Sequence, residues 1–297
     1  MGIFSHICSI FKKSKSDYNP KYVGCNKDAL DTRDHIKVGS PVYSDSLKSI
    51  LGFSLKKYAP KVRNQKDTLA CGGFSAAAAV YILRNKMLKM MYGENEETPK
   101  VTFSPLYIYY NARFEDSIYE EDEYGKLNFP LYDTGTNIRD VMKALKKYGV
   151  IAENVMPFNN YNVKENPPIK NIDISKNFKI KEYLRIKPDN TAEETCKNVL
   201  AVEHLPIIIG LNLFKENIYD LEKTGYLNPV DKNKSTKTGG HAVCITGFKT
   251  INGKTWFEFI NSWGESSGDG GYGYFPAEFL SDKFYTLDIW TFDKSYF

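Results

Sequence analysis

The dipeptide Asn252-Gly253 most constrains how this chain can fold. It lies between a strand-like segment that begins at Ala242 and a second one over Trp256–Ile260, and Asn-Gly is the strongest two-residue signal for a tight β-hairpin. Because the two strands of a hairpin run antiparallel, residues at the start of the first strand return to the level of residues just after the second. His241 and Asn261 stand at these two positions, so we expect them to be neighbours.

The chain before the hairpin is predicted to be helical. A long helix begins at Cys71 and runs through an alanine-rich stretch toward Gly93, a residue that ends helices. A second helix is expected from Pro105 through Tyr110. A third is expected over residues 138–148, where apolar residues recur at i, i+3, i+4 and i+7.

Strands dominate the second half. Thr191 and Glu194 have the spacing of a capping box that opens a helix toward His204, after which residues 206–213 are predicted to form a buried strand. A short helix over 218–223, the hairpin, and strands near Tyr272 and Leu287 follow. Helices followed by strands indicate an α+β fold with a cleft between the two halves.

The first 52 residues are polar and show no sustained helical or strand period, so we interpret residues 1–52 as an N-terminal arm or short prosegment. The folded domain is predicted over 53–297. Its helical subdomain is expected at about 65–160 and its β subdomain at about 161–297.

Composition excludes several function classes. Lys and Arg number 40 against 36 Asp and Glu, and this net charge of +4 gives no nucleic-acid footprint. The chain contains no apolar run long enough to span a membrane. Membrane attachment of the N-terminus is not expected either, because His6 stands where a myristoylation start needs Ser or Thr.

The five cysteines are odd in number and include no C-x-x-C pair, which argues against a zinc site or a disulfide scaffold. We therefore expect a reducing compartment such as the cytoplasm, not secretion.

Cys71, His241 and Asn261 together indicate nucleophilic catalysis by a thiol. The positive end of a helix dipole lowers the pKa of a cysteine, an imidazole can protonate a leaving amine, and an amide oxygen can fix the imidazole tautomer. Each residue alone is also consistent with a structural role. Cys71 could be a small core residue, His241 a buried core histidine, and Asn261 a turn residue.

The segments around these residues resemble the papain and cathepsin family of cysteine peptidases. The resemblance is carried by Val62–Ala76, Gly239–Val243 and Asn261–Gly264. It implies a papain-like two-subdomain fold with an antiparallel, barrel-like sheet in its second half. It also implies an endopeptidase that acts on peptides or proteins, with no cofactor and no metal.

The same resemblance implies a role for individual residues. Cys71 is the nucleophile, His241 its proton partner, and Asn261 the residue that orients the histidine. Gln65 contributes its side chain to the oxyanion hole together with the backbone N–H of Cys71. Trp263 would shield the His–Asn hydrogen bond, and the implied substrate contacts are Gly135, Thr136, Ile138 and Gly240.

Three positions depart from the family pattern. Gly72 stands where the family usually has Trp, Thr68 where it usually has Cys, and Thr136 where it has the second glycine of a substrate-binding pair. The segments Asp31–Asp34 and Ile138–Asp140 are similar to those of the xylellain-like branch.

The arm is expected to lie over the cleft and restrain the enzyme, since a tethered peptide competes at ~mM effective concentration. The alternative is that it is a flexible tail or a targeting segment.

The sequence is also consistent with two other functions. A thiol acyltransferase or isopeptidase would use the same residues, because acyl-enzyme chemistry is shared. A non-catalytic peptide-binding protein would keep the fold without turnover, and Gly72 and Thr136 are consistent with that hypothesis. The sequence does not indicate an oligomeric state.

Overall fold

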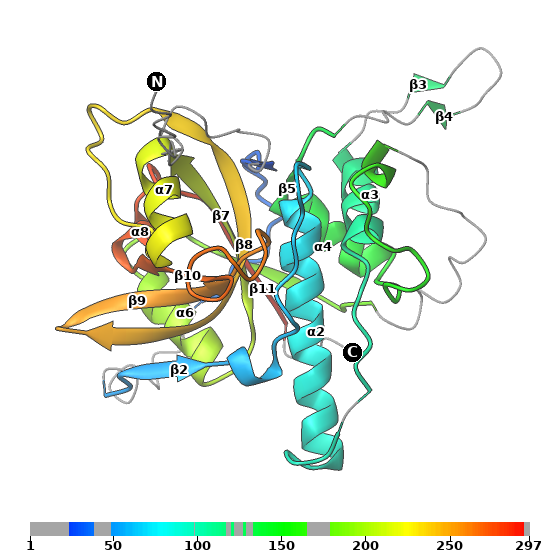
Figure 1. Ribbon diagram of the computed structural model, residues 1–297, viewed down its shortest axis with the longest axis horizontal. Coiled ribbons are helices and arrows are strands. Elements are labelled where there is room, and N and C mark those ends of the chain that lie inside the picture. The colour runs from blue at the N-terminus through cyan, green and yellow to red at the C-terminus, as the bar shows by residue number, and fades with distance from the viewer. Residues whose placement is uncertain are drawn as a thin grey trace, which may run out of the picture.

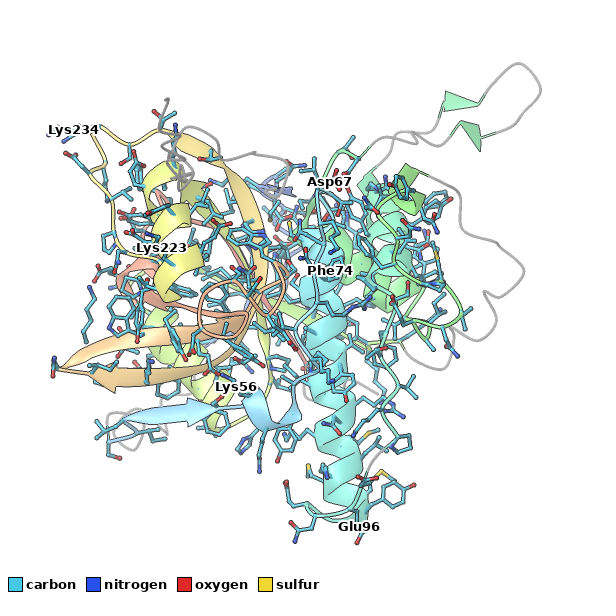
Figure 2. The ribbon with its side chains drawn as sticks, viewed as in Figure 1. Lys56, Asp67, Phe74, Glu96, Lys223 and Lys234 are labelled. Carbon is cyan, nitrogen blue, oxygen red and sulfur yellow. The ribbon has the colours of Figure 1, made fainter. Side chains whose placement is uncertain are left out.

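The computed structural model describes residues 24–38, 49–97, 99–116, 120–121, 127–128, 133–164 and 179–293. A helical half and a sheet half lie side by side, with helix α2 between them (Figure 1). In Figure 2, Asp67 and Phe74 mark the end of α2 at which the candidate site lies, and Glu96 marks its opposite end, which projects beyond the rest of the molecule.

The helical half contains α2 (Cys71–Tyr92), α3 (Pro105–Asp116) and α4 (Ile138–Lys147), so all three predicted helices are confirmed. α2 buries its N-terminal part, Cys71–Val80, whose run of glycine and alanine lets other elements approach closely. The Asn137 side chain caps α4 by accepting a hydrogen bond from the Asp140 backbone N–H (2.9 Å). Among the described residues, no helix is long and apolar enough to cross a membrane.

Short elements complete this half. They are β1 (Cys25–Asn26), η4 (Lys56–Tyr58), β3 (Glu120–Glu121), β4 (Leu127–Asn128), β5 (Thr136–Asn137) and η5 (Asn162–Lys164). β1 belongs to the arm and pairs in parallel with β5, immediately before α4.

The second half is one antiparallel sheet with the strand order β10-β9-β8-β7-β11-β6. Its strands are β6 (Tyr183–Ile186), β7 (Ile207–Phe214), β8 (Lys237–Ile251), β9 (Lys254–Ile260), β10 (Tyr272–Pro276) and β11 (Thr286–Phe292). β2 (Gly52–Ser54) pairs with β8 beside this path. In the described part of the chain no pairing joins β10 to β6, so the expected barrel-like sheet is open and not closed into a barrel.

The predicted hairpin joins β8 to β9. Asn252 and Gly253 both have positive φ (51° and 75°), as a two-residue type I′ turn requires. Cys244 faces Ile260 across the two strands. The turn, together with a one-residue irregularity between Ile245 and Gly247, therefore sets the register that returns Asn261 to the start of β8.

Three helices lie along the sheet half: α6 (Ala192–Ala201), α7 (Lys215–Thr224) and α8 (Glu278–Ser281). The predicted capping box at α6 is wrong. The Thr191 hydroxyl donates to the Asp189 carboxylate (2.6 Å) and makes no hydrogen bond to the helix backbone. The Thr191 backbone is also helical (φ −92°, ψ −8°), whereas an extended backbone is typical of a capping residue. The helix also ends before His204.

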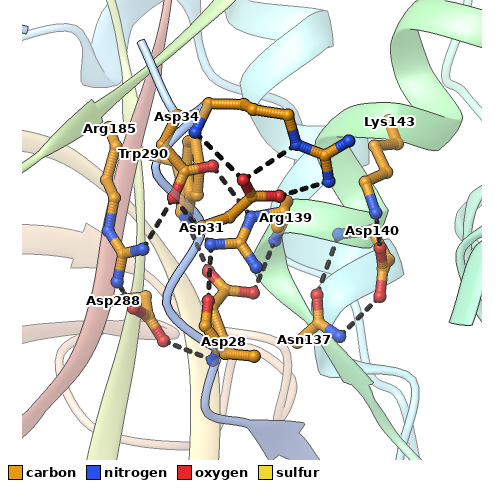
Figure 3. Close-up of polar contacts among 12 residues, drawn as sticks. Asp28, Asp31, Asp34, Asn137, Arg139, Asp140, Lys143, Arg185, Asp288 and Trp290 are labelled. Carbon is orange, nitrogen blue, oxygen red and sulfur yellow. Dashed lines mark hydrogen bonds and ion pairs between the residues drawn. The ribbon is translucent and has the colours of Figure 1, made fainter. Parts of the chain in front are cut away.

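Residues 24–38 of the arm are held by buried ion pairs (Figure 3). Asp34 accepts two hydrogen bonds from Arg139 of α4 (Nε–Oδ1 2.9 Å, Nη2–Oδ2 2.6 Å) and one from Arg185 of β6 (Nη1–Oδ2 2.8 Å). The Asp34 side chain is only 7% exposed. A single arm residue thus joins the helical half to the sheet half.

Asp28 makes a second attachment to the sheet. Its carboxylate accepts a hydrogen bond from the Trp290 indole (2.8 Å), and its backbone N–H donates to Asp288 of β11 (2.7 Å). Asp288 also pairs with Arg185. We call Asp28, Asp34, Arg139, Arg185 and Asp288 the anchor cluster.

The anchor cluster contains three carboxylates and two guanidinium groups, which leaves one negative charge in excess. Burial, and next the charge of Asp28, raise the pKa of Asp288 to about 7. Burial likewise raises the pKa of Asp28, although its hydrogen bond from Trp290 acts in the opposite direction. A proton shared within the cluster relieves the excess charge.

This proton makes stability depend on pH. The folded-state pKa of Asp288 exceeds its ordinary value of 3.8, so the stabilisation is present below about pH 4 and is lost as pH rises through about 7. We expect the free energy of unfolding of the wild type to fall by ~1–3 kcal/mol more between pH 5 and pH 8 than that of Asp288→Asn. Urea denaturation at both pH values measures this. Equal pH slopes in the two proteins would contradict it, and Asp31→Asn, which alters an exposed pair on the same arm, is the control.

Candidate active site

Cys71 is the first residue of α2 and is fully buried. Its thiol interacts with the backbone of Ala242 on β8, of Gly24 in the arm and of Gly72 in its own helix. Burial raises the pKa of the Cys71 thiol, and these backbone hydrogen bonds act in the opposite direction. The thiol therefore lies where the helix, the sheet and the arm meet.

His241 lies on β8 next to Ala242 and is 1% exposed. Its Nε2 atom is 2.8 Å from Asn261 Oδ1, which also accepts the backbone N–H of Ser262 (2.8 Å). Because an amide oxygen only accepts hydrogen bonds, Nε2 is the donor, and in the neutral ring Nδ1 is the acceptor. The Trp263 ring lies beside the imidazole, with ring centroids 4.7 Å apart. The predicted adjacency of His241 and Asn261 is confirmed.

Gln65 is buried beside this hairpin. Its backbone N–H donates to the Ser262 carbonyl (2.8 Å), and its side-chain Oε1 accepts a hydrogen bond from the Ser262 hydroxyl (2.5 Å). Its Nε2 donates to the Thr68 carbonyl (2.7 Å). These bonds fix which way the amide faces. The role of Ser262 in orienting the Gln65 amide was not predicted from the sequence, although the residue lies within the Asn-Ser-Trp-Gly segment.

The four residues that were predicted to contact substrate lie around Gly24 and Cys25 of the arm. The Thr136 backbone N–H donates to the Gly24 carbonyl (2.9 Å), and Gly135, with φ +75°, lies directly against Gly24. Gly240 lies against the carbonyl of Cys25 with no room for a Cβ. Ile138 is buried close to these residues.

Two further residues lie against the arm, and neither was predicted from the sequence. A Cβ on Gly210 of β7 would lie 2.9 Å from Cys25 Sγ, and Leu287 of β11 packs beside it. A glycine inside the otherwise apolar strand was the signal for Gly210, because it marks close approach of another chain segment. Gly24 and Cys25 thus lie against the residues predicted to contact substrate.

Gly72 and Thr136, two of the departures from the family pattern, are in contact. A Cβ on Gly72 would lie 2.5 Å from Thr136 Oγ1 and 3.0 Å from Val141 Cγ2. The Thr136 side chain therefore points toward α2, away from Gly24, while its backbone N–H still faces the arm. The larger side chain at 136 occupies space that a residue larger than glycine at 72 would need.

Comparisons with known proteins agree with this architecture. A family model described as papain family cysteine protease matches residues 133–279. An uncharacterized peptidase C1-like protein of Acanthamoeba polyphaga mimivirus is 28% identical over 94% of this chain and 84% of its own.

Solved structures show the same fold. Xylellain, a cysteine protease from Xylella fastidiosa, superposes with a TM-score of 0.76 at 25% identity, covering 92% of this chain and 96% of its own. Digestive procathepsin L 3 of Tenebrio molitor has a TM-score of 0.62 at 14% identity, covering 94% and 78%. The fold and these matches define a cysteine peptidase. The chain is papain-like in fold, and residues 133–279 match the model of papain family cysteine proteases.

The contact between Gly72 and Thr136 can be tested by mutation. We expect Gly72→Ala to lower the free energy of unfolding by about 1–3 kcal/mol, because the added methyl overpacks against the Thr136 hydroxyl. Adding Thr136→Gly should recover part of this loss in a double-mutant cycle measured by chemical denaturation. Additive losses from the two changes would show that the side chains do not compete for space.

Proposed function

We propose that the protein is an endopeptidase in which Cys71, His241, Asn261 and Gln65 act together on a peptide bond. The observation that supports this is the 2.8 Å hydrogen bond between His241 and Asn261, on a strand whose next residue meets the Cys71 thiol. It orients one ring nitrogen toward Asn261, so the other is available for proton transfer with the thiol.

In the proposed reaction, the Cys71 thiolate attacks the carbonyl carbon of the scissile bond. The imidazolium of His241 then gives its proton to the leaving amine, and an acyl-enzyme remains. Water, deprotonated by the neutral imidazole, hydrolyses the thioester and regenerates the thiol. Asn261 keeps the ring in one tautomer and orientation through both steps.

The oxyanion that forms in each step needs donors held in place beforehand. The Gln65 amide is buried, and its orientation is set by the Ser262 hydroxyl and the Thr68 carbonyl. The backbone N–H of Cys71 is the second proposed donor, since the first N–H groups of a helix have no partner within the helix.

We also propose that the arm restrains this enzyme in the uncleaved chain. Gly24 contacts the Cys71 thiol, and Gly24–Asn26 fills the positions assigned to substrate. Burial raises the pKa of Cys71, which disfavours the nucleophilic thiolate, although the hydrogen bond with the Gly24 backbone acts in the opposite direction. Peptide substrates then enter only when this segment moves away.

Opening of the arm is tested with Gly24→Leu. Any side chain at residue 24 would overlap the backbone and Cβ of Leu69, so the variant should expel the segment from the cleft. We expect a labelling rate of Cys71 by a thiol-directed peptide inhibitor several-fold above that of the wild type, as followed by mass spectrometry. Ala29→Leu places the same side chain at an exposed arm position and should label as the wild type does. Equal labelling in all three proteins would exclude the restraint.

The nucleophile is tested by Cys71→Ala in both the wild-type and Gly24→Leu backgrounds. Alanine is a good helix former, so the fold should persist while hydrolysis of a peptide library falls to background. Mass-spectrometric detection of products and circular dichroism provide the two readouts. His241→Ala should be nearly as severe and Asn261→Ala milder, because Asn261 orients the proton carrier without being one. Undiminished cleavage by Cys71→Ala would refute the assignment.

Gln65→Ala separates oxyanion stabilisation from substrate binding. We expect a loss of about 3 kcal/mol in transition-state stabilisation, seen as a lower kcat with little change in KM. Steady-state kinetics on one peptide substrate give both constants. A change confined to KM would make Gln65 a substrate-binding residue instead.

A further inference from the structure

The described part of the arm makes two kinds of contact with the rest of the molecule. Its first part, the cleft segment (Gly24–Asn26), lies over Cys71. Its second part, the anchor segment (Asp28–Lys37), lies against α4, β6 and β11. We infer that only the cleft segment leaves when the enzyme opens, while the anchor segment stays bound as a permanent part of the peptidase. This inference rests on the restraint proposed above.

The cleft segment is held by few and neutral contacts. The Gly24 carbonyl accepts the Thr136 N–H, and β1 pairs with β5 over two residues only. Cys25 buries one small side chain against Gly210. Neutral hydrogen bonds of this kind contribute little net stability, since water replaces them when they open. These contacts therefore oppose separation of the segment from its site only weakly.

The anchor segment is held by charged and buried contacts. Asp34 is the acceptor for both Arg139 and Arg185, whose side chains are 9% and 10% exposed. Removing Asp34 would break three charged hydrogen bonds and leave buried N–H groups of Arg139 and Arg185 without this acceptor, which is strongly destabilising. The anchor segment is therefore bound more strongly than the cleft segment, because its contacts are charged and buried.

Backbone and side-chain contacts extend along the whole anchor segment. The Arg185 N–H donates to the His35 carbonyl (2.8 Å), and the Lys37 N–H donates to the Arg185 carbonyl (2.7 Å). Arg139 Nη2 donates to the Ala29 carbonyl (2.7 Å). Lys37 pairs with Glu203, which is 4% exposed (2.7 Å). The segment thus lies along the edge of β6. If it departed, the backbone N–H and carbonyl of Arg185 would lose their partners.

The boundary between the two segments is accessible. Asn26 and Lys27 are both exposed, whereas Cys25 and Asp28 on either side are buried. The arm can therefore bend here, and a cut here would free the cleft segment alone. Removal of the arm as far as Leu51 would instead take Asp28 and Asp34 out of the anchor cluster.

Hydrogen–deuterium exchange on the full chain tests this division. In Gly24→Leu we expect exchange in peptides that contain Thr136 to rise by at least about tenfold, with peptides that contain Lys37 or Arg185 unchanged. The melting temperature should stay within about 2 °C of the wild type. In Asp34→Asn we expect the peptides with Lys37 and Arg185 to exchange faster and the melting temperature to fall by about 6 °C or more. Asp31→Asn, whose partner Arg33 is exposed, is the matched control and should change neither.

Equal acceleration at Thr136 and Arg185 in Gly24→Leu would overturn the inference, because the arm would then leave as one unit. An unchanged melting temperature in Asp34→Asn would overturn it as well. If Asp34→Asn does not fold, hydrogen–deuterium exchange of the wild type tests the inference. Peptides that contain Thr136 must then exchange faster than peptides that contain Arg185. A Gly24→Leu protein that exposes Thr136 but cleaves no peptide would refute the proposed function and leave the inference standing. If Gly24→Leu cleaves peptides but exchange is accelerated equally at Thr136 and Arg185, the proposed function stands and the inference is refuted.

Discussion

The candidate site depends on the packing of β8 against the first turn of α2. The Cys71 thiol meets the backbone of Ala242, and this contact brings His241 to the helix N-terminus. On its other side α2 meets α3 closely, because Gly73 lies directly under the Pro105 carbonyl of α3 and leaves no room for a Cβ. α2 is therefore the common surface on which both halves of the molecule are built.

The hairpin then completes the site. Its turn and the irregularity between Ile245 and Gly247 set the register of β8 and β9, and the residues just after β9 contact His241 within the hairpin and Gln65 far away in the sequence. Ser262 has a part in both connections. Its backbone N–H fixes the Asn261 oxygen, and its hydroxyl fixes the Gln65 amide. One short segment thus orients the imidazole and the amide together.

The arm is bound by a different physical principle at each end. Over the cleft, three glycines, Gly135, Gly210 and Gly240, lie against its backbone and side chain, so contact depends on the absence of side chains. At the anchor cluster, contact depends on charge, and the excess carboxylate is accommodated by a proton at raised pKa. Shape complementarity without charge is readily reversed, whereas a buried ion pair is not.

Local sequence by itself determined the elements and the order of the site residues. The Asn252-Gly253 turn, the small-residue helix that begins at Cys71 and the alternation of helix and strand all depend on neighbours within a few residues, and the structure has them as predicted. The predicted capping box is absent because the Thr191 hydroxyl is directed to Asp189 and the Thr191 backbone is helical, not extended. Only the tertiary structure decided that Asp34 pairs with Arg139 and that Gly24 covers Cys71. These partners lie far apart in the chain, and burial and charge balance, which no local pattern encodes, select them.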